Sequence, residues 1–378
     1  MNIVLNLILS ASFLFSGGCK SENENNKNSF KNSEKTSTQT EIFVSNLEVP
    51  WSIVFTSNER VLVNERSGRM RVISGGKLQD EPIKTFAEVS SGSEEGLMGL
   101  TIDPDYNSNK HIYVSFAYEK DGDLWVKVVR YKDNGNSLSE ETTIFDNIPA
   151  ARFHAGCRIK FGPDKKLYIT TGDAGERKFA QELDKLHGKI LRINPDGTIP
   201  ADNPFANSPV WSYGHRNPQG IDWVPGTEIM WQTEHGPSGF DGPGGGDEVN
   251  VIVKGKNYGW PEVSHLDSKE GMVSPVLVFT PAEAPASGLV YKSGKLAEFK
   301  DTFLFGCLRG NGIMVVTIDP NDRSKALSFS KIATEYGRIR EITEGPDGYI
   351  YFSSSNKDGR GSPKSGDDKI YRIVHSKN

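Results

Sequence analysis

The sequence has few cysteines, no excess of positive charge and no long helical pattern, and each absence excludes a class of protein. Three cysteines in 378 residues are too few for a disulfide framework or a structural zinc site. A net charge of −5 offers no basic surface for nucleic acid. The best amphipathic helix candidate, residues 179–186, is too short to favour a parallel α/β fold. The glycine run at 242–246 precedes no helical pattern, so the chain lacks a nucleotide-binding fingerprint, and it also lacks a Gly-x-Ser-x-Gly elbow.

The first 19 residues have the pattern of a lipoprotein signal. Residues 3–15 are mostly apolar but too few to span a bilayer, and small residues lead from them to Cys19. This order predicts a cleaved signal with a lipid on Cys19. An ordinary signal peptide with a chance cysteine is the alternative. In both cases we expect an exported protein, periplasmic or at the cell surface. As a lipoprotein it touches a membrane only through the Cys19 anchor.

The next segment, residues 20–40, is polar and of low complexity. Phe30 is its only large apolar side chain, so it buries too little surface to offset the entropy lost on ordering. We expect a flexible tether that leads to one folded domain at 41–378, and we expect a monomer. Export permits a disulfide between Cys157 and Cys307, but two buried free thiols are favoured because two cysteines make no framework.

The domain contains a loose repeat in which an apolar strand, a Pro/Asp/Gly turn and an aromatic-rich strand follow one another. This pattern predicts a β-hairpin. Six copies are found, at residues 53–64, 102–115, 161–170, 221–233, 288–306 and 344–353. Repeated hairpins with strand-rich connections are typical of a propeller. We therefore predict an all-β fold, a six-bladed β-propeller of four-stranded antiparallel blades, in which residues 41–47 close the ring against the last blade.

His154 is a candidate general base. It stands just before the predicted strand 159–161, and such strand-entry positions in a propeller face the central channel or the cavity above it. A neutral imidazole there accepts a proton near neutral pH, since the ordinary pKa of histidine is about 6.5. Asp173, which follows the predicted strand 167–171, is placed to hold the other ring nitrogen. A structural histidine and an ordinary Gly-Asp turn are the alternatives.

Arg216 and Asn217 lie in a polar run, residues 214–220, inside an otherwise β-rich domain. A guanidinium group binds carboxylates through two parallel hydrogen bonds, and an amide side chain both donates and accepts. The pair therefore suits an anionic ligand.

Arg309, Arg338 and Arg340 add three more cations. Arg338 and Arg340 are two residues apart, so on a strand they share one face and repel each other unless an anion lies between them. We expect these three arginines and Arg216 to lack a protein counter-charge. The alternative is a pair of rim arginines neutralised by Glu335 and Glu341.

The run that contains Gly236 and Pro237 precedes a glycine-rich loop and then Asp247 and Glu248. Backbone carbonyls beside glycine and proline, with carboxylates nearby, suit a hard cation such as Ca²⁺. No EF-hand ladder of aspartates occurs in the sequence.

The ordered motifs resemble those of the aldose sugar dehydrogenases that use pyrroloquinoline quinone (PQQ), the soluble glucose dehydrogenase class. The resemblance covers about residues 41–374. Its markers lie at residues 94–100, 151–156, 171–173, 188–194, 214–220, 234–237, 246–248, 257–261 and 337–340.

The resemblance implies a six-bladed propeller with PQQ in a cavity on its top face and an aldose as substrate. His154 resembles the base that takes the proton of the anomeric hydroxyl, with Asp173 orienting it while hydride passes to the quinone. The positions that match cofactor contacts are Glu94, Arg216, Asn217, Arg309, Arg338 and Arg340. Gly236 and Pro237 match carbonyl ligands of the calcium that polarises the quinone, and Glu248 and Tyr258 match a second calcium site. The electron acceptor is left unidentified.

The sequence departs from the family pattern at several positions. Glu94 stands where several members have Gln, and Arg309 stands where Lys is usual. The loop 238–246 is longer than the compact family form. The family's Ser-Ile-Ala-Pro-Ser-Gly stretch corresponds to residues 282–288 in an uncertain register, so no cofactor contact is assigned there. Two other functions remain open: a lipid-anchored propeller that only binds a partner, and a calcium-dependent lactone hydrolase, which needs carboxylates and Asn directly on its metal.

Overall fold

The computed structural model describes residues 38–376. The predicted signal segment and most of the predicted tether, residues 20–37, lie outside the described residues. Within the described chain, no helix is long and apolar enough to cross a membrane.

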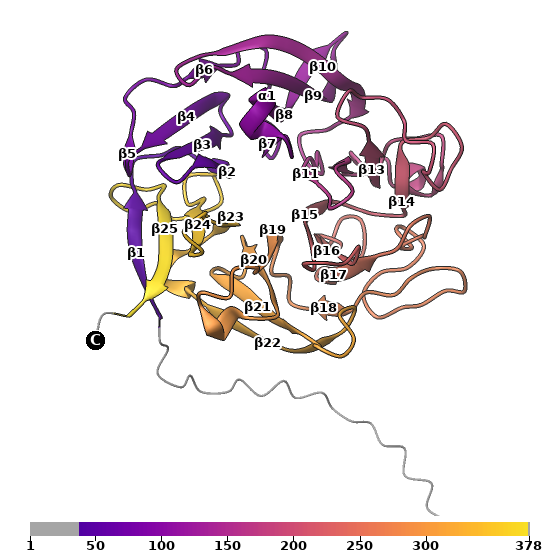
Figure 1. The fold of residues 1–378 in the computed structure, drawn as a ribbon. Coiled ribbons are helices and arrows are strands. Elements are labelled where there is room, and N and C mark those ends of the chain that lie inside the picture. Colours follow the sequence, from indigo (N-terminus) through magenta and orange to yellow (C-terminus); the bar gives the residue numbers. More distant parts are fainter. Residues whose placement is uncertain (1–37, 377–378) are drawn as a thin grey trace, which may run out of the picture. The chain divides into compact units, whose positions relative to one another are not determined.

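Six antiparallel sheets are arranged around a central axis (Figure 1). From the centre outward, the first blade is β2 (Pro50–Ser57), β3 (Arg60–Glu65), β4 (Arg69–Ser74) and β5 (Lys77–Leu78), with β6 (Lys84–Thr85) also paired to β4. The second blade is β7 (Leu97–Ile102), β8 (His111–Lys120), β9 (Asp123–Asp133) and β10 (Leu138–Pro149). The third blade is β11 (Ile159–Phe161), β12 (Leu167–Thr171), β13 (Lys189–Ile193) and β14 (Val210–Tyr213). The next three are β15 (Pro218–Trp223), β16 (Met230–Glu234), β17 (Asp247–Ile252) and β18 (Leu277–Phe279); β19 (Pro285–Val290), β20 (Thr302–Cys307), β21 (Ile313–Ile318) and β22 (Ala326–Ile332); and β23 (Ile339–Glu344), β24 (Ile350–Ser354), β25 (Ile370–His375) and β1 (Thr38–Val44).

The predicted all-β six-bladed propeller is confirmed, and each predicted hairpin forms the two innermost strands of one blade. The last blade takes its outer strand from the start of the domain, because β1 pairs antiparallel with β25 from Thr38↔His375 to Val44↔Ile370. This closing strand begins at Thr38, inside the segment predicted as tether. The helical candidate at 179–186 is instead a short 3₁₀ helix, η1 (Arg177–Gln181), and the other helices are α1 (Tyr106–Asn109), η2 (Ala297–Phe299) and η3 (Thr334–Tyr336).

The repeated Pro-Asp turn has one physical cause in two blades. Asp164 accepts a hydrogen bond from the N–H two residues on (3.1 Å) and another from the hydroxyl of Tyr168 (3.0 Å). Asp347 does the same with the N–H two residues on (3.2 Å) and the hydroxyl of Tyr351 (2.9 Å). An aspartate that bonds its own following backbone fixes a turn, and the tyrosine ties that turn to the next strand.

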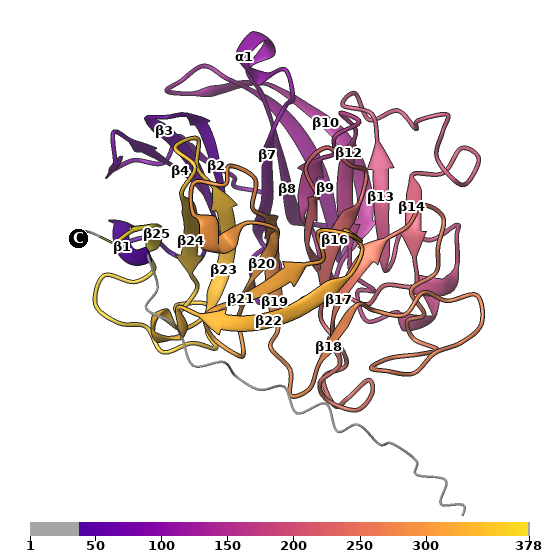
Figure 2. The same ribbon diagram turned by 60° about the horizontal axis from the view of Figure 1, so that its bottom comes forward.

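The chain direction of the blades decides where a site forms. In every blade the innermost strand precedes the next two strands in sequence. The outermost strand follows them as well, except in the last blade, where the outermost strand is β1 from the start of the domain. Figure 2 shows strands of neighbouring blades side by side, seen from a direction tilted by 60°. The residues that enter the innermost strands therefore meet at one end of the axis, together with the residues that follow the second strands, because antiparallel neighbours bring these two positions to the same end.

Candidate active site

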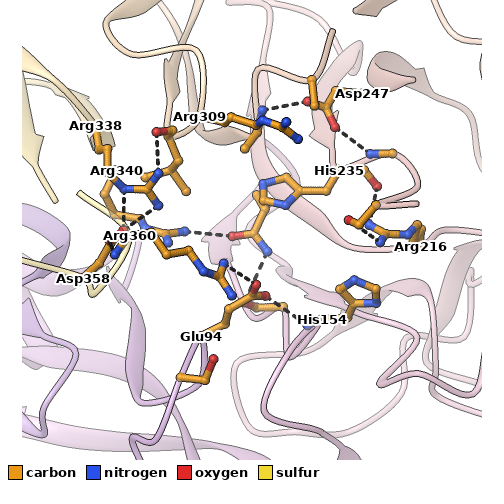
Figure 3. Close-up of a pocket in the computed structure, with 18 of the residues that line it drawn as sticks. Glu94, His154, Arg216, His235, Asp247, Arg309, Arg338, Arg340, Asp358 and Arg360 are labelled. Atoms are coloured by element: carbon orange, nitrogen blue, oxygen red, sulfur yellow. Dashed lines mark hydrogen bonds and ion pairs between the residues drawn. The ribbon is translucent and has the colours of Figure 1, made fainter. Parts of the chain in front are cut away.

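A cavity of about 390 Å³ opens at this end of the propeller (Figure 3). Residues at the entries to all six innermost strands line it, together with residues from the loops after several second strands. The lining residues are Trp51, Arg66, Ser93, Glu94, His154, Gly156, Arg216, Gln219, His235, Gly236, Pro237, Ser238, Asp247, Ala282, Ala284, Leu308, Arg309, Arg338, Arg340, Asp358 and Arg360.

His154 lines the cavity, and the side chain of Asp173 holds its imidazole ring in place. Its Nδ1 lies 2.7 Å from Oδ1 of Asp173, which is fully buried. The N–H of Gly175 also donates to Oδ1 (2.9 Å), and the indole N–H of Trp260 donates to Oδ2 (2.8 Å). Because the carboxylate accepts from every group around it, Nδ1 carries the proton, and Nε2 is left as the ring's acceptor.

The backbone allows this pairing only with glycine at position 172. A Cβ there would lie 1.8 Å from the carbonyl oxygen of His154, so a side chain would push the two loops apart. His154 itself has a φ of 53°, a left-handed conformation that is uncommon outside glycine. The loop geometry, and not the strand, thus directs the imidazole.

Glu94 lies beside the histidine and links it to the opposite wall. Its Oε2 accepts the backbone N–H of His154 (3.1 Å), and its Oε1 pairs with Arg360 (2.8 Å). Although burial raises the pKa of Glu94, the hydrogen bond from Arg360 and the nearby histidines lower it to about 2. Glu94 is therefore ionised near neutral pH, and it accepts hydrogen bonds without donating them.

The expectation that the arginines lack a protein counter-charge is wrong for two of them. Arg216 pairs through Nε with Asp241 (2.7 Å), and Arg338 pairs with Asp358 (2.7 Å). The alternative partners are also wrong, since Glu341 pairs instead with Arg158 (2.5 Å).

Arg340 is different, because it is buried without an acid partner. It is 6% exposed, its Nη1 donates to the amide oxygen of Gln219 (3.2 Å), and its Nε has no hydrogen-bond partner. Burial, together with the neighbouring guanidinium groups of Arg66 and Arg338 and against the opposing charge of Asp358, lowers the pKa of Arg340 to about 9. The wall thus holds a positive charge that the described residues do not compensate.

Of the two remaining predicted cofactor contacts, one lines the cavity and the other lies behind the residues that line it. Arg309 lines the cavity from the loop after β20 and is exposed. Asn217 is buried behind the lining: its Oδ1 accepts from Gln219 (3.1 Å), and its Nδ2 has no partner.

Gly236 and Pro237, the predicted calcium ligands, line the cavity. The carbonyl of Pro237 already accepts the N–H of Gly245 (3.2 Å). Asp247 beside them is used by the backbone, since it accepts the N–H groups of Gly236 (2.8 Å) and Ala284 (2.7 Å), among others. In the part of the chain that the structure describes, no group of three His, Cys, Asp or Glu residues is arranged to hold a metal.

Glu248 and Tyr258 lie behind this wall, where a smaller pocket contains both of them and Glu234. Glu248 is directly opposite Glu234 on the neighbouring strand, and burial together with the charge of Glu234 raises the pKa of Glu248 to about 8. The hydroxyl of Tyr258 donates to the carbonyl of Val251 (2.7 Å) and accepts the N–H of Val253 (2.8 Å), so only its backbone oxygen is available to a cation.

Several lining residues were missed from the sequence. Arg66, His235 and Asp358 follow the second strands of their blades, as Asp173 and Arg309 do. Position after the second strand of each hairpin was the signal that would have found them. Arg360 and Trp260 had no such signal, because they lie deeper in long loops.

The favoured state of the two cysteines agrees with the structure. Cys157 and Cys307 are both free and buried. Burial raises the pKa of Cys157 to about 12 and raises that of Cys307 as well.

Comparison with known proteins gives one consistent result. The chain matches the model of the Glucose / Sorbosone dehydrogenase family over residues 47–371. It is 31% identical to the aldose sugar dehydrogenase YliI of Escherichia coli, over 84% of this chain and 90% of that one. It is 25% identical to the quinoprotein glucose dehydrogenase B of Acinetobacter calcoaceticus, over 82% and 84%. The PQQ-bound aldose sugar dehydrogenase of Streptomyces coelicolor has a similar structure, with a TM-score of 0.78 and 30% identity over 89% of this chain and 98% of that one.

Proposed function

The chain belongs to the Glucose / Sorbosone dehydrogenase family, and from that premise we propose that it is a PQQ- and calcium-dependent dehydrogenase that oxidises aldose sugars to lactones. The observation that carries the proposal is the His154–Asp173 pair at the wall of a strongly cationic cavity. Relatives named as aldose sugar dehydrogenases support the substrate class.

The residues present fit a PQQ molecule, which carries three carboxylates. Six arginines and three carboxylates line the cavity, a net charge of +3 over the lining with neutral histidines, or +2 when the buried Asp241 that pairs with Arg216 is counted. The six are Arg66, Arg216, Arg309, Arg338, Arg340 and Arg360, and the three are Glu94, Asp247 and Asp358. The unpartnered Nε of Arg340 is the clearest sign of a missing anion, because a buried donor without an acceptor costs about 1–3 kcal/mol. We assign cofactor carboxylates first to Arg340, then to Arg309, and last to the N–H groups that remain on Arg216 and Arg338, because every side-chain nitrogen of these two already donates one hydrogen bond within the protein. Asn217 does not line the cavity; its side chain accepts a hydrogen bond from Gln219, which does, so Asn217 acts by positioning Gln219.

When bound, PQQ supplies a quinone that accepts hydride from C1 of the sugar. The protein moves the proton: Nε2 of His154 takes it from the anomeric hydroxyl as the C1–O bond becomes a carbonyl. Asp173 stabilises the imidazolium that results. Trp260 and Gly175 hold Asp173 in place, so the carboxylate needs no rearrangement when charge develops beside it. One hydride and one proton leave the sugar, which balances its oxidation to the lactone.

Calcium is assigned to the carbonyls of Gly236 and Pro237. Two oxygens from the described wall are fewer than the six to eight that Ca²⁺ takes, so cofactor oxygens and water would complete the site. A second calcium at Glu248 and the backbone oxygen of Tyr258 would offset the repulsion between Glu234 and Glu248.

The remaining assignments follow the sequence. We propose export as a monomeric lipoprotein held by Cys19, with residues 1–19 as signal, a polar tether after them and the propeller as the catalytic domain. The substrate is a small aldose, and the electron acceptor is unidentified.

Loading the purified protein with PQQ and Ca²⁺ and assaying aldoses with an artificial acceptor dye tests the proposal. We expect PQQ uptake by calorimetry, a rise in melting temperature and aldose-dependent dye reduction. His154→Ala should bind PQQ as the wild type does and lose about 10²–10⁴-fold in turnover. PQQ binding without oxidation of any aldose would favour a binding module, and no uptake at micromolar PQQ would refute the cofactor assignment.

A further inference from the structure

Two exposed phenylalanines, which are not among the residues that line the cavity, lie beside His154, and the reaction described above gives them no role. Phe240 is 69% exposed and Phe153 is 38% exposed. The rings of Phe240 and His154 are stacked, with centroids 6.4 Å apart and planes 20° apart. Phe153 lies edge-on to both, 4.9 Å from His154 and 5.9 Å from Phe240. The imidazole itself is 5% exposed, so the two phenylalanines form the apolar surface that adjoins it.

The loop that carries Phe240 is anchored at the next residue. Asp241 is buried and pairs with Nε of Arg216 (2.7 Å). Its carboxylate also accepts the N–H of Ser238 (2.8 Å), and its carbonyl accepts from Arg177 (2.8 Å). Three anchors therefore fix the backbone beside Phe240 while its own ring stays in solvent. An exposed aromatic ring on an anchored loop is unfavourable in water, which points to a ligand that covers it.

The chemistry of the base says what that ligand is. Nδ1 of His154 is committed to Asp173, so a substrate hydroxyl must reach Nε2. A sugar ring that places C1–OH there lies next to the surface formed by Phe153 and Phe240. Pyranose and furanose rings carry C–H groups on their faces, and a flat aromatic ring removes such a face from water without opposing the hydroxyls at the ring edge.

We propose that Phe240, together with Phe153, is the sugar-binding wall of the active site and that Phe240 sets the affinity for the aldose. This inference rests on the proposed function and deepens it. Phe153 lies in the marker 151–156 of the family resemblance, whereas Phe240 lies in the loop 238–246, which the resemblance leads us to expect is longer than the compact family form. Phe240 touches the substrate's apolar face and takes no part in proton transfer.

The test separates sugar binding from every other step. The PQQ-loaded enzyme with Ca²⁺ and no acceptor is mixed rapidly with aldose, and reduction of the cofactor is followed over time. The dependence of the reduction rate on aldose concentration gives an apparent Kd for the sugar and a limiting rate of reduction. We expect Phe240→Ala to raise that Kd about two- to tenfold, the range of one aromatic contact, and to change the limiting rate by less than about twofold. Phe240→Trp should keep the wild-type Kd. Leu327→Ala is the matched control, because Leu327 is 60% exposed on the outer strand β22 and should change nothing.

Each other outcome has a definite meaning. An unchanged sugar Kd in Phe240→Ala refutes the wall. A weaker PQQ affinity or a lower melting temperature in that variant would show that Phe240 only supports the loop. A raised KM for the acceptor with sugar binding intact would assign the surface to the electron acceptor. If the wild type itself binds no PQQ or oxidises no aldose, the proposed function fails, and Phe240 is not at issue.

Discussion

Replacing Asp173 with asparagine probes the proton-holding unit most directly, because the structure shows what every atom of this carboxylate does. Three donors point at it: Nδ1–H of His154 at 2.7 Å and the N–H of Gly175 at 2.9 Å on Oδ1, and the indole N–H of Trp260 at 2.8 Å on Oδ2. Asparagine offers one oxygen and one NH₂ group. With its oxygen in the place of Oδ1 it satisfies two donors, and its NH₂ then meets the indole N–H of Trp260.

This orientation keeps the proton on Nδ1, so Nε2 of His154 remains able to act as a base. What disappears is the negative charge beside the developing imidazolium. A hydrogen bond to a charged group exceeds a neutral one by about 1–2 kcal/mol, which corresponds to a loss of about 5- to 30-fold in kcat. The reverse orientation would leave the proton on Nε2 and abolish the base, for a loss of about 10⁴-fold as in triads with the wrong tautomer. We expect the first orientation, in which Nδ1 keeps its proton, and therefore expect Asp173→Asn to lose less than His154→Ala.

The clash with Trp260 is a structural effect, and a second substitution removes it. Trp260→Phe deletes the indole N–H, so the double variant of Asp173→Asn and Trp260→Phe should recover stability lost by the single variant, but not its activity. Dye-reduction assays at saturating PQQ give kcat, calorimetry gives the PQQ affinity, and thermal unfolding gives the stability. Wild-type kcat in Asp173→Asn, or activity that returns with stability in the double variant, would refute the role of the carboxylate charge.

Three further predictions rest on single features. Arg340→Met should raise the Kd for PQQ about 10- to 100-fold, from the loss of a charge-assisted contact, without destabilising the apo-protein, because the buried guanidinium has no acid partner; calorimetry and thermal unfolding measure both, and an unchanged Kd would remove Arg340 from the cofactor site. Cys157 and Cys307 should resist thiol reagents in the native protein and both react after unfolding without reductant; a mass spectrum showing a disulfide would contradict the free thiols. A protein that begins at Thr38 should melt as cooperatively as the full chain, whereas deletion of 38–44 should lower the melting temperature by exposing the edge of β25; an equal melting temperature would show that β1 does not close the ring.

The repeated hairpins were readable from the sequence because their cause is local. In two of the Pro-Asp turns the aspartate accepts a hydrogen bond from backbone only two residues away, as Asp164 and Asp347 show, and a turn of this kind fixes two strands at once. Six such units imply closure, since each blade buries its faces only against its neighbours. The sequence motifs likewise located His154, Asp173 and most of the arginines at loop ends, where a propeller gathers polar groups.

The pairing of those groups was decided by the tertiary structure. Arg216 and Arg338 look like unpaired cations in the sequence, yet long loops bring Asp241 and Asp358 to them. Arg340 looks the same but meets no acid, and only the folded cavity reveals that its Nε lacks a partner.

The sequence by itself determined the architecture and the residue types at the site, because hairpin turns and strand periodicity are short-range properties of the chain. The tertiary structure alone decided which charges are neutralised, which imidazole nitrogen is free and which phenylalanines adjoin the base. These depend on contacts between loops of different blades, such as Glu94 with Arg360 across 266 positions, and no local pattern encodes a contact whose partners meet only when the ring closes.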